Sequence, residues 1–225
     1  QDGRKYLKQK YSNGELREEK KYTYYDLGQI ESTKEHIYDS NDKITNEIIT
    51  KWSKSGKMIS KLNNGIIWKG EVTSWWDDDS KYKKQIVEYL DGKKHGEVQV
   101  FYKNNNKLRY KGKYNNGLMH GKWTYYWENG NKKVEGSFKN GNGRNKNDIT
   151  NVPTNGRDGM WSSWHANGKK WSRLNFTNGK KNGKQINWYD NGQKEVEGSY
   201  ENDVPIKTWS WWYIDGAPMQ EGEYN

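Results

Sequence analysis

A single pattern recurs at nearly fixed spacing along this chain of 225 residues, and it constrains the fold more than any other feature. The pattern reads G-x-W-x-x-[WY]-[WYH]-x-[ND]-G, then a few residues, then E-G-x-[YF]-x-N-G. Its clear copies begin at Gly121, Gly159, Gly183 and Lys207. The usual step from one copy to the next is about 24 residues, a period that indicates a repeat architecture.

Each copy contains two short runs that favour extended structure, separated by turn signals. Asn-Gly dipeptides such as Asn129-Gly130 and Asn191-Gly192 recur between the runs, and they tolerate the positive φ angles of tight hairpin turns. The runs are rich in Trp, Tyr, Thr, Ile and Val, which suit a pleated surface. Each repeat is therefore predicted to be one β-hairpin. The expected fold is all-β, an elongated single-layer antiparallel sheet of tandem β-hairpin repeats.

The composition fits a thin sheet whose ordered residues are aromatic. Leu, Ile, Val and Phe supply only about 14% of the chain and the net charge is +10, values typical of disordered proteins. The 13 Trp and 17 Tyr residues argue for order, because a large aromatic side chain can bury about 150–250 Å². Rows of rings stacked at the repeat spacing would replace an aliphatic core. The recurring Glu-Gly dipeptide would permit a close backbone approach beside a bulky ring, or a bulge.

The sequence offers no set of residues for catalysis, metal binding or a cofactor. It contains no Cys, which excludes disulfides, thiolate metal sites and a Cys nucleophile. The four His residues are isolated, and neither a phosphate-binding loop nor a nucleophile-elbow motif occurs. The acidic run Asp77-Asp78-Asp79 is expected to be a solvated turn, with calcium binding as the alternative. We therefore expect a protein that is not an enzyme.

The copies of the repeat match the pattern less well in the first part of the chain than in the second. Residues 1–95 contain degenerate copies and residues 96–225 contain clear ones, so one continuous array with two qualities of repeat is expected. One step is longer than the others, which places an inserted loop at about residues 142–158. This loop is polar and contains several Gly and Asn residues. A flexible connector is the default expectation, and a loop that carries binding contacts is the alternative.

The segments Gly121–Gly141 and Gly183–Asn202 carry the pattern most fully, and they resemble the variant class of MORN repeat. This class includes the bacterial YwqK-type antitoxin-like repeat family. The resemblance implies a single-layer, twisted sheet of hairpins, with protein binding, membrane association or toxin neutralisation as the roles. The chain departs from the pattern at Gln185, where Trp is expected, and at His165 in the aromatic pair. A weaker likeness, to the choline-binding repeats of cell-wall proteins, does not account for the Glu-Gly-x-Tyr half.

A single-layer sheet cannot cover both of its faces, so some aromatic rings are predicted to be exposed as a binding surface. Variation within the repeat indicates where, because a variable position is not required by the fold. Tyr125, Ser163, Asn187 and Trp211 are equivalent and variable. The predicted binding residues are Tyr125, Trp127, Trp164, Trp188, Trp209, Trp211 and Trp212.

These features predict a protein-binding or scaffold module, secreted or exposed on the surface of a bacterium. One alternative is a glycan- or cell-wall-binding module that uses the aromatic rows, and another is a cytoplasmic antitoxin or immunity protein. The expected partner is another protein, with a glycan or an anionic surface as alternatives. Specific nucleic-acid binding is not expected, because basic and acidic residues are interspersed. Pairing through open sheet edges would allow homo-oligomers.

Overall fold

The computed structural model describes residues 4, 6–41, 43–52, 56, 58–76, 82–103, 105–147 and 149–224. These residues form seventeen strands and no helix, and hence no helix long and apolar enough to cross a membrane. The acidic run Asp77-Asp78-Asp79 lies outside the described residues. The chain divides into two compact units. Unit 1 comprises Gln1–Val72 and Val87–His95, and unit 2 comprises Thr73–Ile86 and Gly96–Asn225.

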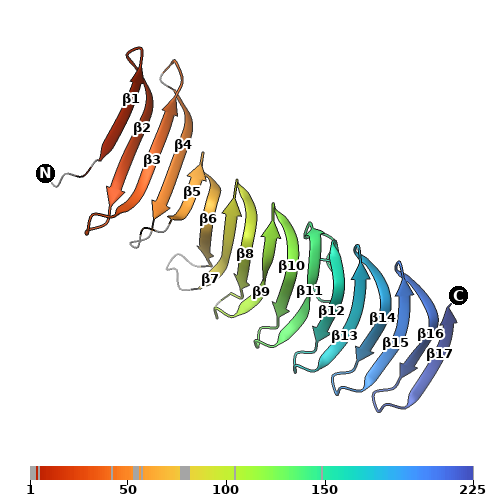
Figure 1. Ribbon diagram of the computed structural model, residues 1–225. Helices are drawn as coiled ribbons and strands as arrows, with labels where there is room; N and C mark the ends of the chain where they lie inside the picture. Colours follow the sequence, from red (N-terminus) through yellow and green to blue (C-terminus); the bar gives the residue numbers. More distant parts are fainter. Residues whose placement is uncertain are drawn as a thin grey trace. The chain divides into compact units, whose positions relative to one another are not determined.

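Unit 1 is an antiparallel meander in which each strand pairs with the next along the chain (Figure 1). Its turns follow the sequence prediction, since Asn13 and Gly14 both adopt positive φ between the first two strands, as do Asn64 and Gly65 between the last two. The strands are β1 (Leu7–Ser12), β2 (Glu15–Tyr24), β3 (Ile30–Tyr38), β4 (Ile44–Trp52), β5 (Met58–Asn63) and β6 (Ile66–Trp75).

Unit 2 repeats the same arrangement with more regular hairpins. Three strands contribute residues to both units, namely β6, β7 (Lys83–Leu90) and β8 (Lys93–Phe101). From β8 onward each strand pairs antiparallel with the next, so the predicted all-β, single-layer sheet of tandem hairpins is confirmed within the unit (Figure 1). The remaining strands are β9 (Leu108–Asn115), β10 (Leu118–Tyr126), β11 (Lys132–Gly141), β12 (Arg157–Trp164), β13 (Lys170–Thr177), β14 (Lys180–Trp188), β15 (Lys194–Glu201), β16 (Val204–Trp212) and β17 (Pro218–Tyr224).

The core of unit 2 is a row of rings on one face of the sheet, as the composition predicts. Ring centroids lie 5.9 Å apart for Trp123 and Phe138, 4.9 Å for Phe138 and Trp161, and 6.3 Å for Trp161 and Phe176. Most of these contacts are edge-to-face, the arrangement that aromatic quadrupoles favour. Trp123 keeps only 1% of its surface exposed. We call this side of the sheet the aromatic face, and its residues are Tyr110, Tyr114, Trp123, Tyr125, Phe138, Trp161, Phe176 and Trp209.

Each buried Trp ring of this row lies flat over a glycine of the preceding hairpin. A Cβ placed on Gly136 would lie 2.1 Å from Cδ2 of Trp161, and one on Gly198 would lie 2.0 Å from Cδ2 of Trp209. Gly112 lies under Trp123 in the same way. These glycines come from the Glu-Gly half of the repeat or its equivalent. The sequence expectation of a close backbone approach beside a bulky ring is therefore confirmed.

The junction between two successive hairpins, where β13 pairs with β14, breaks this rule on both strands. Leu174 occupies the glycine position of β13, and Gln185 occupies the Trp position of β14 directly opposite it. A leucine side chain fills the space that a ring would need, so the shorter Gln185 side chain is what fits there. The departure at Gln185 is thus explained by its neighbour.

A second periodic contact ties each hairpin to the next. The side chain of the second aromatic residue of a repeat hydrogen-bonds to a backbone carbonyl one repeat later. Trp127 Nε1 donates to Trp164 O at 2.9 Å, and Tyr189 Oη donates to Trp212 O at 2.9 Å. His165 pairs with Trp188 O at 2.8 Å through Nε2. The departure at His165 therefore preserves the hydrogen bond that the position makes.

Candidate binding face of unit 2

The two faces of unit 2 differ in how their charges are arranged. On the face opposite the rings, Glu135 forms ion pairs with Lys122 at 3.1 Å and Lys132 at 2.9 Å. Glu197 pairs with Lys184 and Lys194 in the same way. Burial alone would raise the pKa of Glu135, but hydrogen bonds from the two lysines outweigh it and hold that pKa below its usual value. We call this side the ion-paired face.

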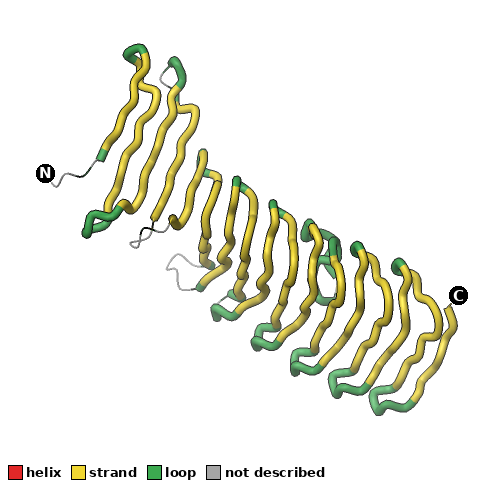
Figure 2. The backbone as a smooth tube through the Cα atoms, in the orientation of Figure 1, coloured by secondary structure: helices red, strands yellow, loops and turns green. Residues whose placement is uncertain are grey.

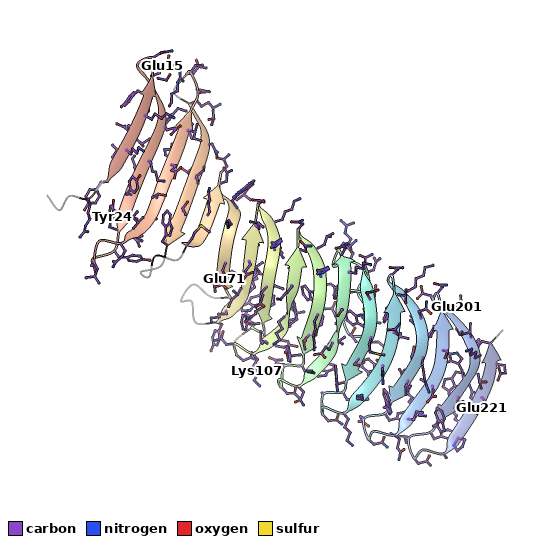
Figure 3. All side chains as sticks on the ribbon, in the orientation of Figure 1. Glu15, Tyr24, Glu71, Lys107, Glu201 and Glu221 are labelled. Atoms are coloured by element: carbon purple, nitrogen blue, oxygen red, sulfur yellow. The ribbon has the colours of Figure 1, made fainter. Side chains whose placement is uncertain are left out.

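A β-bulge recurs at the same register position in each hairpin of unit 2. Tyr125 pairs with Val134 and Tyr126 pairs with Lys132, which leaves Lys133 as the extra residue. Bulges re-aim the side chain that they insert. Lys107, labelled in Figure 3, lies in the turn at the bulge end of β9, two residues before the first bulge. We call these extra residues the bulge row, and they are Arg109, Lys133, Trp171, Glu195 and Met219.

The insert joins β11 to β12 (Figure 2), and its residues line a cleft together with rings of the aromatic face. It spans residues 142–156, because Arg157 already begins β12. A bridge joins Lys146 to Pro153, and Val152 keeps only 1% of its surface exposed. The sequence predicts an inserted loop at about 142–158, as a flexible connector or as a loop that carries binding contacts. In the structure, Val152 and Pro153 are the buried residues among those of the insert that the structure describes, and most of the others are exposed.

Arg157 anchors the insert to the rings beneath it. Its Nε donates to Pro153 O at 2.9 Å, and its guanidinium carbon lies 4.3 Å from the ring centroid of Trp161. Burial lowers the pKa of Arg157 to about 10, so the group stays charged at neutral pH. The insert and the aromatic face are thus joined by hydrogen bonds and a cation–π contact.

The insert leaves a cleft on each side. The first has a volume of about 380 Å³, and it is lined by aromatic rings, by the bulge residues Arg109 and Lys133, and by Lys146 of the insert. The Lys133 ammonium lies 4.2 Å from the ring centroid of Trp127. Burial lowers the pKa of Lys133, and the charge of Arg109 lowers it further. This cleft therefore holds cations close to one another.

The second cleft has a volume of about 220 Å³ and lies over β12–β14. Its lining combines the rings of Trp161 and Trp171 with the amides of Gln185 and Asn187. Gln185 Nε2 donates to Asn187 Oδ1 at 3.1 Å. Gln185 Oε1 is buried, and no hydrogen-bond donor reaches it among the described residues. The cleft thus offers both flat rings and a free acceptor.

The predicted binding residues fall into different environments. Tyr125 is predicted to be exposed, but only 8% of its surface is exposed. Its ring packs against those of Trp123 and Tyr110, and it lines the first cleft together with residues of the insert. Its equivalent Ser163 is also buried. The prediction of exposure is wrong at both positions, since the insert was not expected to cover the rings.

The remaining predicted residues are partly or fully engaged within the sheet. The prediction of exposure is also wrong at Trp209, whose ring is buried over Gly198. Trp211 stacks on it with ring centroids 6.1 Å apart. Trp127 makes the hydrogen bond to the next hairpin described above. Lysine ammonium groups lie 5.5, 5.9 and 4.8 Å from the ring centroids of Trp164, Trp188 and Trp212, respectively.

The residues of the bulge row are not among the binding residues predicted from the sequence. The signal of the row was present, because each member is the third residue after a turn residue with positive φ, namely Asn106, Gly130, Gly168, Gly192 or Gly216. The residue type there differs in every copy. Without the register, however, a variable position beside a turn could not be assigned to a face.

Comparison with known proteins bears on the hairpins of unit 2. The MORN repeat variant family matches residues 119–140, 157–178 and 181–202. A comparison with curated proteins finds no match. One similar structure is a crystal structure of TcdB2-TccC3 without its hypervariable C-terminal region, with 10% identity and a TM-score of 0.24 over 92% of this chain and 13% of that one.

Another similar structure is a Photorhabdus luminescens Tc holotoxin pore with the TccC3 mutation D651A, with 11% identity and a TM-score of 0.17 over 97% of this chain and 16% of that one. The chain thus spans less than a fifth of either structure, and scores this low support no argument about fold or role. The family matches coincide with β10–β11, β12–β13 and β14–β15. These three hairpins of unit 2 are therefore repeats of the MORN variant type.

Proposed function

We propose that unit 2 is a non-enzymatic protein-binding module whose partner contacts the aromatic face through the bulge row and the insert. The bulge row carries this proposal. Five hairpins place a bulge at one register position, yet the five side chains differ in charge, size and polarity. The fold requires the bulge and leaves the side chain free, so the row is suited to selecting a partner.

The chemistry of the row and its surroundings supports a protein partner. Arg, Trp, Tyr and Met are enriched at the centres of protein interfaces, and Arg109, Trp171 and Met219 lie in the row. Met219 has 52% of its surface exposed. The opposite face is less suited, because four of its lysines are already paired with glutamates, namely Lys122, Lys132, Lys184 and Lys194. MORN-type repeats, which this unit contains, are associated with binding.

The second cleft supports the glycan-binding alternative. A sugar ring stacks on a flat aromatic surface and bonds through its hydroxyls to amide groups, and this cleft offers Trp171, Gln185 and Asn187 together. A glycan array with Trp171→Ala and Trp211→Ala as controls tests this alternative. Sugar binding that Trp171→Ala abolishes would establish it, and signals at background level would remove it.

Site-specific photo-cross-linking in an extract of the native cells tests the protein-binding proposal. A photoreactive residue at Trp171 or Met219 is expected to give discrete, protease-sensitive adducts. The same residue at Lys111 or Ser210, toward the ion-paired face, is expected to give none. Equal adducts from both faces, or none from the bulge row, would contradict the proposal. Adducts that resist protease and yield to glycosidases would favour the glycan alternative.

The proposal extends to a secreted or surface location in a bacterium, and to kinship with the YwqK-type antitoxin-like family implied by the repeat sequence. A cytoplasmic antitoxin or immunity protein is the competing assignment. Fractionation of the native cells separates the two. Recovery in the medium or on the cell surface would support secretion, and recovery only in the cytoplasm would support the competitor.

A further inference from the structure

We propose that the first cleft binds an acidic segment of the partner protein, with an Asp or Glu carboxylate seated between Arg109 and Lys133. This inference rests on the proposed protein-binding function and names the chemistry that its first cleft selects. The cleft lies between the β9–β11 part of the aromatic face and the insert.

The positions of the cations are the first support. Arg109 and Lys133 are the extra residues of bulges in two successive hairpins, and Lys146 reaches the cleft from the insert. No Asp or Glu is among the described residues that line the cleft. The pKa of Lys133 is lowered by burial and by the charge of Arg109. A carboxylate placed between the two groups would attract both and relieve their mutual repulsion.

The contrast with the ion-paired face is the second support. There, Glu135 pairs with Lys122 and Lys132, so those cations are already neutralised. Among the described residues, no carboxylate forms an ion pair with Arg109, Lys133 or Lys146. The Lys133 ammonium instead rests on the ring of Trp127. Basic groups left without a counter-charge on one face favour an acidic partner at that face.

The shape and walls of the cleft favour a peptide. Its volume of about 380 Å³ matches a few side chains and not a folded surface. Tyr102, Tyr110 and Tyr125 line it beside the cations, so a ligand with apolar side chains next to a carboxylate would fit both kinds of wall. A sulfated glycan would bring several anions and little apolar surface, which suits these tyrosines less well.

Fluorescence anisotropy on the full chain tests the inference. The probe is a short fluorescein-labelled peptide of alternating Glu and Tyr residues, and its matched control contains Gln in place of Glu. The Glu peptide is expected to bind at least about tenfold more tightly than the Gln peptide. The double variant Arg109→Glu/Lys133→Glu is expected to bind the Glu peptide at least about tenfold more weakly than the unchanged chain does.

A matched double variant separates the cleft from the general positive charge of the chain. Lys111 and Lys139 are exposed strand lysines outside the first cleft, so Lys111→Glu/Lys139→Glu changes the net charge by the same amount. Its effect is expected to stay below about threefold. Equal weakening by both double variants would overturn the inference. If the first variant loses its circular dichroism, Arg109→Gln/Lys133→Gln takes its place, with a loss of at least about threefold expected.

Two further outcomes have distinct meanings. Heparin that binds with the same dependence on Arg109 and Lys133, while the Glu peptide does not bind, would overturn the inference in favour of an anionic glycan. Protein cross-links from Trp171 and Met219 without any preference for the Glu peptide would overturn the inference and leave the proposed function standing. Absence of those cross-links would contradict the proposed function, whatever the peptide does.

Discussion

Units 1 and 2 are built from the same hairpin, but different contacts hold their hairpins together. In unit 2, strand glycines such as Gly136 admit the Trp rings that form the buried row. In unit 1, every described glycine has positive φ, so none of them provides a flat strand surface for a ring. Its neighbouring strands are joined by ion pairs such as Lys20–Glu35 and Lys34–Glu47.

This difference shows what a single-layer sheet needs to gain an interior. A strand glycine lets a ring of the next hairpin lie against the backbone, and the ring is then covered by its neighbours. Burying a Trp side chain contributes several kcal/mol (about 3–5 on truncation to Ala). An exposed ion pair contributes about 0–1 kcal/mol. Unit 2 is therefore expected to resist unfolding more strongly than unit 1.

The largest expected effect comes from filling one of these strand glycines. Gly136→Ala would place a methyl group inside the Trp161 ring and is expected to destabilise unit 2 by about 3 kcal/mol. Gly222→Ala is the matched control, because its Cβ would meet Trp211 at an ordinary 3.6 Å. Native-state hydrogen exchange of unit 2 measures both. Equal losses for the two variants would show that the ring contact is not the cause.

The exceptional junction between β13 and β14 can be restored to the usual arrangement by mutation. Gln185→Trp alone is expected to destabilise unit 2, because Leu174 fills the place of the ring. Leu174→Gly/Gln185→Trp restores the arrangement of the other hairpins. A double-mutant cycle is expected to give a favourable coupling of about 2 kcal/mol between the two positions. Additive effects would mean that the glycine and the ring do not depend on each other.

A smaller effect, in this case an increase in stability, is expected at a strained residue that stands where the other repeats have glycine. Lys207 has φ 61°, at the position where Gly121, Gly159 and Gly183 adopt similar positive angles. Relief of the left-handed strain outweighs the added chain entropy, so Lys207→Gly is expected to stabilise unit 2 by about 0.5 kcal/mol. Lys139→Gly, in an ordinary strand position, is expected to destabilise it. Thermal melts of the two variants check these opposite signs.

The smallest effect is expected in the ion pairs of unit 1. The Glu47 carboxylate accepts hydrogen bonds from Lys34 and His36, and these lower its pKa below the ordinary value of 4.5. A group with a lowered folded pKa stabilises the fold above the ordinary pKa and loses that contribution as pH falls through the folded value. As the pH falls below about 4.5, the melting temperature of unit 1 should therefore decrease slightly. The decrease should be smaller in Glu47→Gln. If that variant shows the same pH dependence, the decrease arises from groups other than Glu47.

Much of the fold could be predicted from the sequence, because its signals are local. Asn-Gly turns and the period of about 24 residues give the hairpins, and the Glu-Gly dipeptide gives the close approach to a ring. The binding surface was less accessible. Exposure of Tyr125 depends on where an insert some twenty residues later folds. The placement of Arg109 and Lys133 depends on bulges that only the strand register reveals.

The central claim is that the bulge row serves binding and not folding. Replacing Arg109, Lys133, Trp171, Glu195 and Met219 together by Ala in the full chain tests this claim most directly. The thermal melt is expected to show that the free energy of unfolding falls by no more than about 2 kcal/mol. Binding of the partner captured by cross-linking is expected to be lost. A chain that unfolds, or one that folds and still binds the partner with unchanged affinity, would contradict the claim.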